Sequence, residues 1–121
     1  MTLRDQIRNV IDDEPVAIFI KGTPERPACG NSMRALQALR NAGAPITAVD
    51  ILPDPQIRQE LTALSDWPTI PQVFVKGELL GGADITEELF ASGELARKLD
   101  DALGEEREQV VKTVSVAATT T

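Results

Sequence analysis

The chain has 121 residues, of which 42% are hydrophobic and 26% are charged, and its net charge is −7. This length suits one domain. Because only 3% of the residues are aromatic, we expect its core to be aliphatic. The negative charge argues against nucleic acids and anionic membranes as partners, since phosphate-rich surfaces bind clustered Lys and Arg. No apolar run approaches the roughly 20 residues of a membrane span.

The content of histidine and cysteine excludes several kinds of chemistry. The chain has no histidine, so a Ser-His-Asp triad, a Cys-His pair and an imidazole metal site are excluded. A zinc or iron–sulfur site needs about four ligands, several of them usually thiolates, and Cys29 is the only cysteine. Other molecules would have to supply the remaining thiolates. A lone cysteine and an N-terminus typical of an amphipathic helix predict a reducing, cytoplasmic location.

The predicted elements alternate between helices and short apolar strands. Helical spacing followed by Pro15 predicts a helix over residues 3–13, and VAIFIK predicts a strand buried on both faces. The later elements are a helix over residues 29–42 with Met33, Leu36 and Leu39 on one face, a strand over residues 46–52, a helix over residues 55–64 capped by Asp54, a hairpin over residues 72–82, a helix capped by Asp84, and a last helix ending near Leu103.

This order of elements predicts a small α/β sandwich. A helix separates the first two strands, so they should run parallel with a right-handed crossover, and the hairpin should add two antiparallel strands. A mixed four-stranded sheet with helices on both faces follows. We expect the domain to span residues 1–103. Residues 104–121 are charged and then rich in Val, Ala and Thr, and are expected to form a flexible tail.

Cys29 lies in KGTPERPACG, between a loop that follows a strand and the N-terminus of a helix. Free amides and the positive end of the helix dipole stabilise a thiolate there, so its pKa should fall below the ordinary value of about 8.5. Lys21, at the end of the preceding strand, adds a positive charge. The alternative is a buried, inert cysteine. A polar loop rich in proline and glycine is a poor place for a core residue.

Two later segments carry residues that could surround a ligand. In WPTIPQVFV, a cis Ile70–Pro71 bond before the strand would turn Thr69 and Ile70 outward with free backbone groups. In GGADITEELF, two glycines before a helix bring backbone amides close to a bound molecule. Both segments also have an ordinary interpretation, with Trp67 as a partly buried loop anchor and GGAD as a plain turn into a capped helix.

Together, KGTPERPACG, WPTIP and GGADI resemble the monothiol glutaredoxin family, whose members carry a Cys-Gly-Phe-Ser motif. The resemblance covers residues 7–99, with the motifs in the same order and at matching spacing. It implies a thioredoxin-like fold, a bound glutathione and the carriage of iron–sulfur clusters, with weak thiol-transfer activity. In cluster-bound members, two protein cysteines and two glutathione thiolates hold a [2Fe–2S] unit between two subunits. That arrangement would supply the four thiolate ligands that a chain with one cysteine cannot provide alone.

The resemblance also implies roles for individual residues. Cys29 would be the active thiolate and, in a homodimer, the protein ligand of the cluster. Lys21 and Arg58 would bind the glycyl carboxylate of glutathione. The other expected contacts are Thr69, Ile70 and Pro71 along the cysteine unit of glutathione, and Gly82, Ala83 and Asp84 at its γ-glutamyl end, with the aspartate on the ammonium group.

The sequence departs from the family motif at Asn31, since it reads Cys29-Gly30-Asn31-Ser32. A phenyl ring beside the cysteine would exclude water, whereas an amide is polar and forms hydrogen bonds. A wetter site should make a bridged cluster more labile, so Asn31→Phe should lengthen its lifetime. Ser32 stands where dithiol relatives have a second cysteine. A mixed disulfide on Cys29 would therefore be resolved only by a second glutathione.

Three functions remain open from the sequence. The first is a glutathione-dependent [2Fe–2S] carrier that forms a homodimer around the cluster and passes it to iron–sulfur client proteins. The second is an enzyme, a monothiol oxidoreductase that removes glutathione from protein mixed disulfides without a stable cluster. The third is an inactive regulatory or scaffold descendant that kept the fold. Asn31 bears on the choice between the first two, because it changes the surroundings of Cys29.

Overall fold

The computed structural model describes residues 1–118, which form five helices and five strands. In chain order the elements are α1 (Leu3–Asp13), β1 (Val16–Ile20), α2 (Gly30–Asn41), β2 (Ile46–Asp50), α3 (Pro55–Ser65), β3 (Gln72–Val75), β4 (Glu78–Gly81), α4 (Ala83–Ala91), α5 (Glu94–Leu103) and β5 (Val111–Thr113). The helices and strands predicted up to Leu103 are confirmed. No helix within residues 1–118 is long and apolar enough to cross a membrane.

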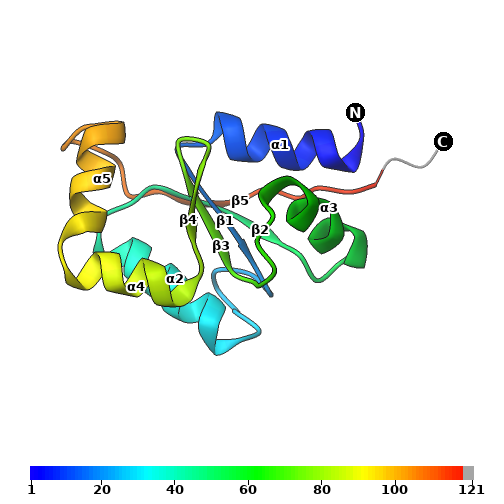
Figure 1. Cartoon of the computed structure of the whole chain (residues 1–121), viewed down its shortest axis with the longest axis horizontal. Helices are drawn as coiled ribbons and strands as arrows, with labels where there is room; N and C mark the ends of the chain where they lie inside the picture. The colour runs from blue at the N-terminus through cyan, green and yellow to red at the C-terminus, as the bar shows by residue number, and fades with distance from the viewer. Residues whose placement is uncertain (119–121) are drawn as a thin grey trace.

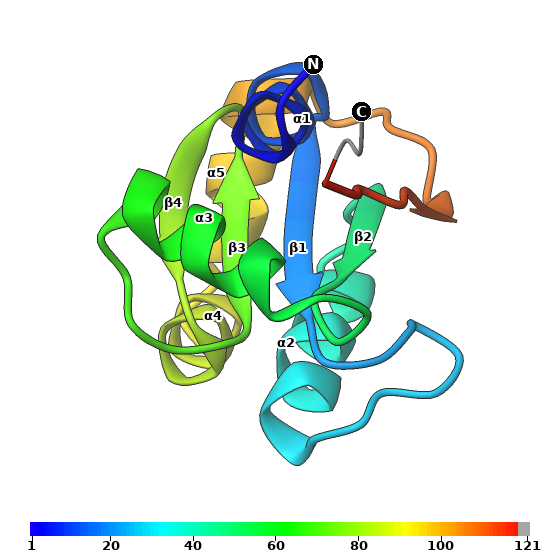
Figure 2. The ribbon, with the colours of Figure 1, turned by 90° about the vertical axis from the view of Figure 1, so that its right-hand side faces the viewer.

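The strands form one mixed sheet in the order β4-β3-β1-β2-β5. Figure 2 shows the four longer strands side by side. β1 and β2 run parallel, whereas β3 runs antiparallel to β1, and β4 antiparallel to β3, as the predicted crossover and hairpin require. The predicted number of strands is wrong, because β5 adds a fifth strand parallel to β2 at the edge of the sheet.

The central strand β1 is buried along its whole length, and its alternate residues enter two separate cores. Val16, Ile18 and Ile20 pack with α2 and α5, whereas Ala17 and Phe19 pack with α1 and α3. This alternation is the two-residue period of a β-strand. Figure 1 shows α1 and α3 on one side of the sheet and α2, α4 and α5 on the other. Helices on both faces of the sheet are therefore confirmed.

The N-termini of α3 and α4 differ in how they are capped. Asp54 accepts a hydrogen bond from the Gln56 amide and Pro55 occupies the first turn of α3, as predicted. The cap predicted for α4 is wrong, because Gly82 is its N-cap and Asp84 lies inside the first turn. The chain turns early at Gly81, whose φ is +139° and where a Cβ atom would lie 2.7 Å from Ile85. Only glycine fits there.

Residues within 104–118, where the sequence predicts a tail, make contacts with the domain. The Arg107 guanidinium is held by oxygen atoms of Ala42, Gly43, Asp100 and Gly104. Residues 111–113 then form β5, and Val116 is buried with the core of α1 and α3. Residues 119–121, the end of the expected tail, lie outside the described residues.

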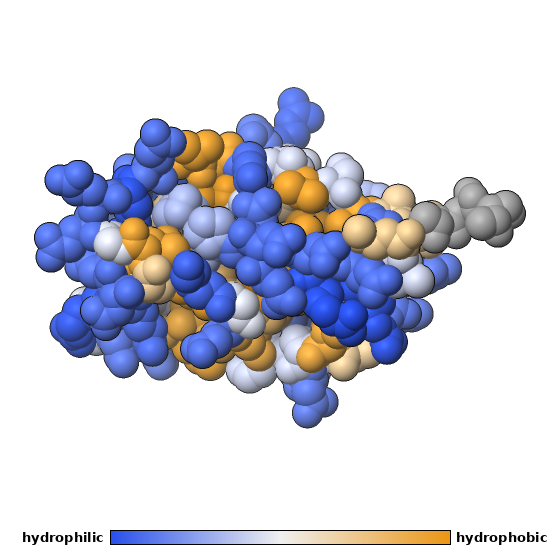
Figure 3. All heavy atoms as spheres, turned by 90° about the horizontal axis from the view of Figure 1, so that it is seen from above, coloured by the Kyte–Doolittle hydropathy of each residue, from blue (hydrophilic) through white to orange (hydrophobic). Residues whose placement is uncertain are grey.

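The surface carries a few exposed apolar side chains. Met33, predicted to share one face with Leu36 and Leu39, is 56% exposed, because the buried face of α2 includes Ser32, Ala35, Leu36 and Leu39. Figure 3 looks onto the side of the molecule that α1 covers and shows mostly hydrophilic residues, with apolar atoms in separate patches. The exposed face of this helix is therefore an ordinary solvated surface.

Candidate functional site

Cys29 is the N-cap residue of α2, at the end of the loop that follows β1. A bridge between Gly22 and Pro27 and a 2.7 Å hydrogen bond from the Ala28 amide to the Lys21 carbonyl close this loop. At Gly22, a Cβ atom would lie 2.5 Å from a backbone oxygen, so the tight return of the chain needs glycine. The loop holds the thiol partly exposed, beyond the carboxyl end of β1.

The surroundings of the Cys29 thiol favour its ionised form. Burial raises its pKa, but the hydroxyl and amide of Ser32, the charge of Lys21 and the amide of Asn31 together bring the pKa below its ordinary value. The sulfur lies 3.1 Å from Ser32 Oγ and 3.4 Å from Ser32 N. Ser32 is fully buried, and its Oγ accepts a hydrogen bond from the Lys21 amide. The lowered pKa expected from the sequence is thus present, with Ser32 as the main source.

Replacing Ser32 with alanine should shift the pH dependence of Cys29 alkylation. Iodoacetamide reacts with the thiolate, so the rate should rise with a midpoint below the ordinary thiol pKa in the wild-type chain. Ser32→Ala removes the hydroxyl donor and should move this midpoint to higher pH. The exposed Ser92 provides the control, because Ser92→Ala should leave the midpoint unchanged. An unshifted midpoint in Ser32→Ala would show that Ser32 does not lower the pKa of Cys29.

The loop before β3 presents backbone groups at the surface. The Ile70–Pro71 bond is cis, as expected. Thr69 is exposed, but the side chain of Ile70 is only 7% exposed and packs in the core of α1 and α3, so the expectation that Ile70 faces outward is wrong for its side chain. Arg58 donates a 3.2 Å hydrogen bond to the Pro68 carbonyl and so supports the loop from α3.

A cavity of about 320 Å³ brings three distant segments together. Its lining residues are Asn31, Trp67, Thr69, Ile70, Pro71, Gly82, Ala83, Asp84 and Ile85. All six residues expected along the cysteine unit and the γ-glutamyl end of glutathione are among them. Cys29 and Lys21 do not line this cavity, and Arg58 lines a second one of about 680 Å³ with Leu52 and Pro68. The two cavities meet the same loop at neighbouring residues, Pro68 and Thr69.

The WPTIP and GGAD segments approach each other closely at Gly82. A Cβ atom there would lie 3.4 Å from the Pro71 carbonyl oxygen and 3.6 Å from Trp67 Nε1. Gly82 provides no side-chain cap, so the first amides of α4 are open to an acceptor. Trp67 is partly buried, as the loop-anchor interpretation predicts, and within residues 1–118 its indole nitrogen is buried without a hydrogen-bond partner.

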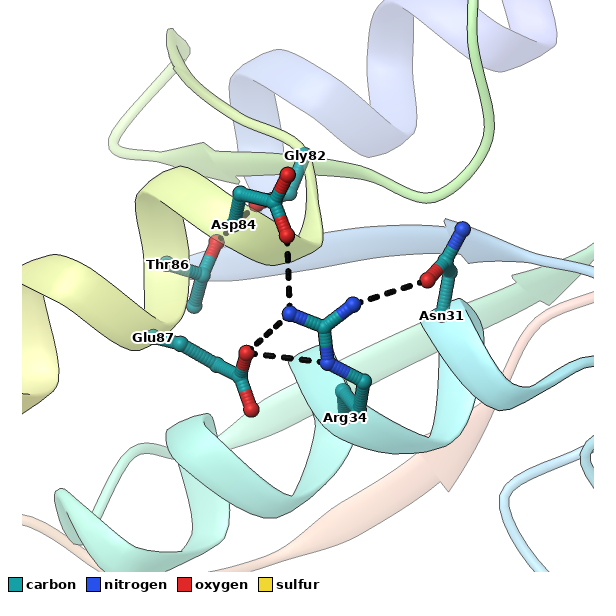
Figure 4. A network of polar contacts seen from close by, with 6 residues as sticks. All are labelled: Asn31, Arg34, Gly82, Asp84, Thr86 and Glu87. Atoms are coloured by element: carbon teal, nitrogen blue, oxygen red, sulfur yellow. Dashed lines mark hydrogen bonds and ion pairs between the residues drawn. The ribbon is translucent and has the colours of Figure 1, made fainter.

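Arg34 and Glu87 also lie at this site, although none of the sequence motifs includes them. Figure 4 shows the Arg34 guanidinium between α2 and α4, where it donates to Asn31 Oδ1 at 2.9 Å, to Asp84 Oδ1 at 2.7 Å and to Glu87. Glu87 and then Asp84 raise the pKa of Arg34, which remains a cation. The available signal was spacing, because Asn31 and Arg34, and likewise Asp84 and Glu87, lie three residues apart on one helix face.

The described residues offer one thiol and no ready-made metal site. Cys29 is the only cysteine, and no group of three or more Cys, Asp or Glu residues within 1–118 is arranged to hold a metal ion. Any metal ion or cluster on Cys29 would therefore need ligands from outside this chain.

A partly exposed thiol of lowered pKa at a helix N-terminus, on an α/β sheet with a cis-proline loop, is typical of the thioredoxin-like class of proteins. The family model described as glutaredoxin matches residues 16–80. The solution structure of reduced poplar apo GrxS14 is 40% identical, with a TM-score of 0.74, over 84% of this chain and 93% of that one.

The chain belongs to the glutaredoxin family, and its single cysteine fits the monothiol type. Glutaredoxin 4 of Pasteurella multocida is 48% identical over 84% of this chain and 93% of its own length. Monothiol glutaredoxin-S11 of Oryza sativa is 46% identical over 83% of this chain, which spans only 20% of that longer protein. The recognition made from three short motifs is thus confirmed over most of the sequence.

Proposed function

We propose that this glutaredoxin binds glutathione and carries a [2Fe–2S] cluster between two copies of the chain. The observation that carries this proposal is the position of Cys29: the only thiol is partly exposed, has a lowered pKa and belongs to the same end of the fold as an open cavity. A thiolate is the form of cysteine that ligates iron. A small thiol bound in the cavity would provide the second ligand for each chain.

The charges around the site match the two ends of glutathione, a tripeptide with a carboxylate at each end and one ammonium group. Lys21 and Arg58 supply positive charge for the glycyl carboxylate. The exposed backbone at Thr69 suits the peptide bonds of the cysteine unit. At the other end, the open amides at the start of α4 suit a carboxylate, and Asp84 suits the ammonium group.

The cluster fits this chain as cargo shared between two copies. One thiolate from each chain and one from each glutathione give the four ligands that such a cluster takes. Asn31 lines the cavity and is exposed, where the family motif has phenylalanine. We therefore infer a site that water and competing thiols reach easily, which suits release of the cluster to client proteins more than long storage.

The second candidate function is removal of glutathione from protein mixed disulfides. The lowered pKa of Cys29 favours it, because the thiolate is the attacking species. Cys29 would attack the glutathione sulfur, forming a disulfide with glutathione as the protein thiolate leaves. A second glutathione thiolate would then attack that disulfide, releasing oxidised glutathione and the Cys29 thiolate. The buried Ser32 cannot take the place of the second thiol.

Anaerobic reconstitution with iron, sulfide and glutathione tests the carrier function. We expect visible cluster absorbance, one cluster for two chains, a dimer in size-exclusion chromatography, and loss of all three when glutathione is replaced by a non-peptide monothiol. Absence of both absorbance and dimer with glutathione would reject the carrier. A glutathione-coupled reductase assay would then decide for the oxidoreductase. If a glutathione titration also gives no amide shifts at Lys21 or Asp84, the scaffold alternative remains.

A further inference from the structure

The side chains of Asn31 and Asp84 are held by the same guanidinium at the edge of the 320 Å³ cavity that both residues line. Asn31 belongs to α2 and Asp84 to α4, so Arg34 joins two elements of the candidate site. Glu87 fixes Arg34 from the opposite side by accepting from both its Nε and Nη2 atoms. Figure 4 shows this arrangement.

The contact with Arg34 determines which way the amide of Asn31 points. A guanidinium has five N–H donors and no acceptor, so only the amide oxygen of Asn31 can face it. That oxygen accepts from Nη1 at 2.9 Å. The amide nitrogen, with two donors, therefore points away from Arg34, as Figure 4 shows. Within residues 1–118 no hydrogen bond from this nitrogen to another residue is formed, so its donors are available to a bound molecule.

Asp84 is oriented in a complementary way. Its Oδ1 accepts from Arg34, which leaves Oδ2 directed away from the guanidinium (Figure 4). Two carboxylates, Asp84 and Glu87, face the single positive charge of Arg34, so the group retains a net negative charge. A net negative charge still attracts an ammonium group. The edge of the cavity thus offers an anionic acceptor at Asp84 and a neutral donor at Asn31.

An α-amino acid end carries an ammonium group and a carboxylate on one carbon atom, and it matches this pair of side chains. We propose that Asn31 is a specificity residue whose amide nitrogen donates to the α-carboxylate of the γ-glutamyl end of glutathione, and that Arg34 is the positioning residue that orients it. This inference rests on the proposed binding of glutathione. Asn31 stands where the family motif has phenylalanine. Phenylalanine has no side-chain donor, so it could not make this contact with the ligand.

The consequence is selection between thiols by their amino-terminal end. A peptide that keeps the ammonium group but lacks the neighbouring carboxylate can still reach Asp84, yet it gives Asn31 no acceptor. One hydrogen bond between a neutral donor and a carboxylate at an exposed site corresponds to about a tenfold difference in affinity. The open amides of α4 would contribute to the same preference, so Asn31 accounts for part of it.

The test compares glutathione with 4-aminobutyryl-cysteinyl-glycine, which lacks only the α-carboxylate. Both are titrated anaerobically into the reduced full chain and followed by amide chemical shifts. We expect wild type to prefer glutathione, and Asn31→Leu to reduce that preference by about tenfold through weaker glutathione binding alone. Asn41→Leu, at the far end of the same helix, is the matched control and should retain the wild-type preference.

Arg34→Met separates positioning from simple structural support. Without the guanidinium of Arg34 the side-chain amide of Asn31 is free to rotate, which should lower the preference for glutathione over the analogue. The substitution also exposes Asp84 and Glu87 without their cation, which should tighten binding of the analogue through its ammonium group. A general loss of structure would weaken both ligands together. An Asn31→Leu variant with the wild-type preference would overturn the inference while leaving glutathione binding intact, whereas a wild-type chain that binds neither peptide would overturn the proposed function itself.

Discussion

Replacing Cys29 with serine should abolish both cluster assembly and glutathione-dependent reduction while the protein stays folded. A serine hydroxyl is not ionised near neutral pH and is not a soft ligand for iron, so neither function has a substitute group in a chain with one cysteine. The fold should survive because Cys29 is a partly exposed N-cap residue, and serine is among the best N-caps. Visible absorbance after reconstitution and the reductase assay measure the two losses.

The control for Cys29→Ser is binding of glutathione to the same variant. Lys21, Thr69 and Asp84 are unchanged, so amide shifts on titration should persist even though no cluster forms. Persistent shifts together with lost absorbance would show that the thiolate, and not the cavity, was removed. Visible cluster absorbance in Cys29→Ser would contradict the assignment of Cys29 as the protein ligand, since the chain has no other thiol.

The parts of the fold that follow local rules could be predicted from the sequence. The run VAIFI is apolar at every position and became the central strand, buried on both faces. Asp54 followed by Pro55 marked the start of α3, because both residues have a specific position at a helix N-terminus. Cys29 was correctly placed at a helix N-terminus, because it lies between a loop rich in proline and glycine and a segment with helical spacing. Its lowered pKa, however, depends on the buried hydroxyl of Ser32, a contact that only the helix geometry reveals.

The features that the sequence did not reveal depend on contacts between distant residues. Arg34 has no unusual neighbours in the sequence, and its partners Asp84 and Glu87 lie fifty or more residues away on α4. The cap of α4 moved from Asp84 to Gly82 because Gly81 adopts a backbone conformation that other residues avoid. Sequence patterns of hydrophobicity record which face of an element is buried, but not which polar side chains meet across elements.

The position of the C-terminal segment also depends on contacts between residues that are distant in the sequence. Replacing Arg107 with methionine should therefore destabilise the protein by about 2–4 kcal/mol. The Arg107 side chain is 12% exposed and pairs with Asp100 at 2.6 Å. It also donates to the carbonyls of Ala42, Gly43 and Gly104, which lie at the ends of α2 and α5. Helix C-termini leave such carbonyls without helical partners, so methionine would leave them unsatisfied. Urea unfolding measures the change.

Arg97→Met is the matched control for this prediction. Arg97 lies on the exposed face of α5, and the same substitution there should change the free energy of unfolding by no more than about 0.5 kcal/mol. Arg107→Met should also release β5 from the edge of β2, because the guanidinium fixes the chain just before that strand. Faster hydrogen exchange at the Ile46 amide, which donates to the Val110 carbonyl, would report the release. Equal stability of the two variants would show that the contacts of the Arg107 guanidinium contribute nothing to the stability of the fold.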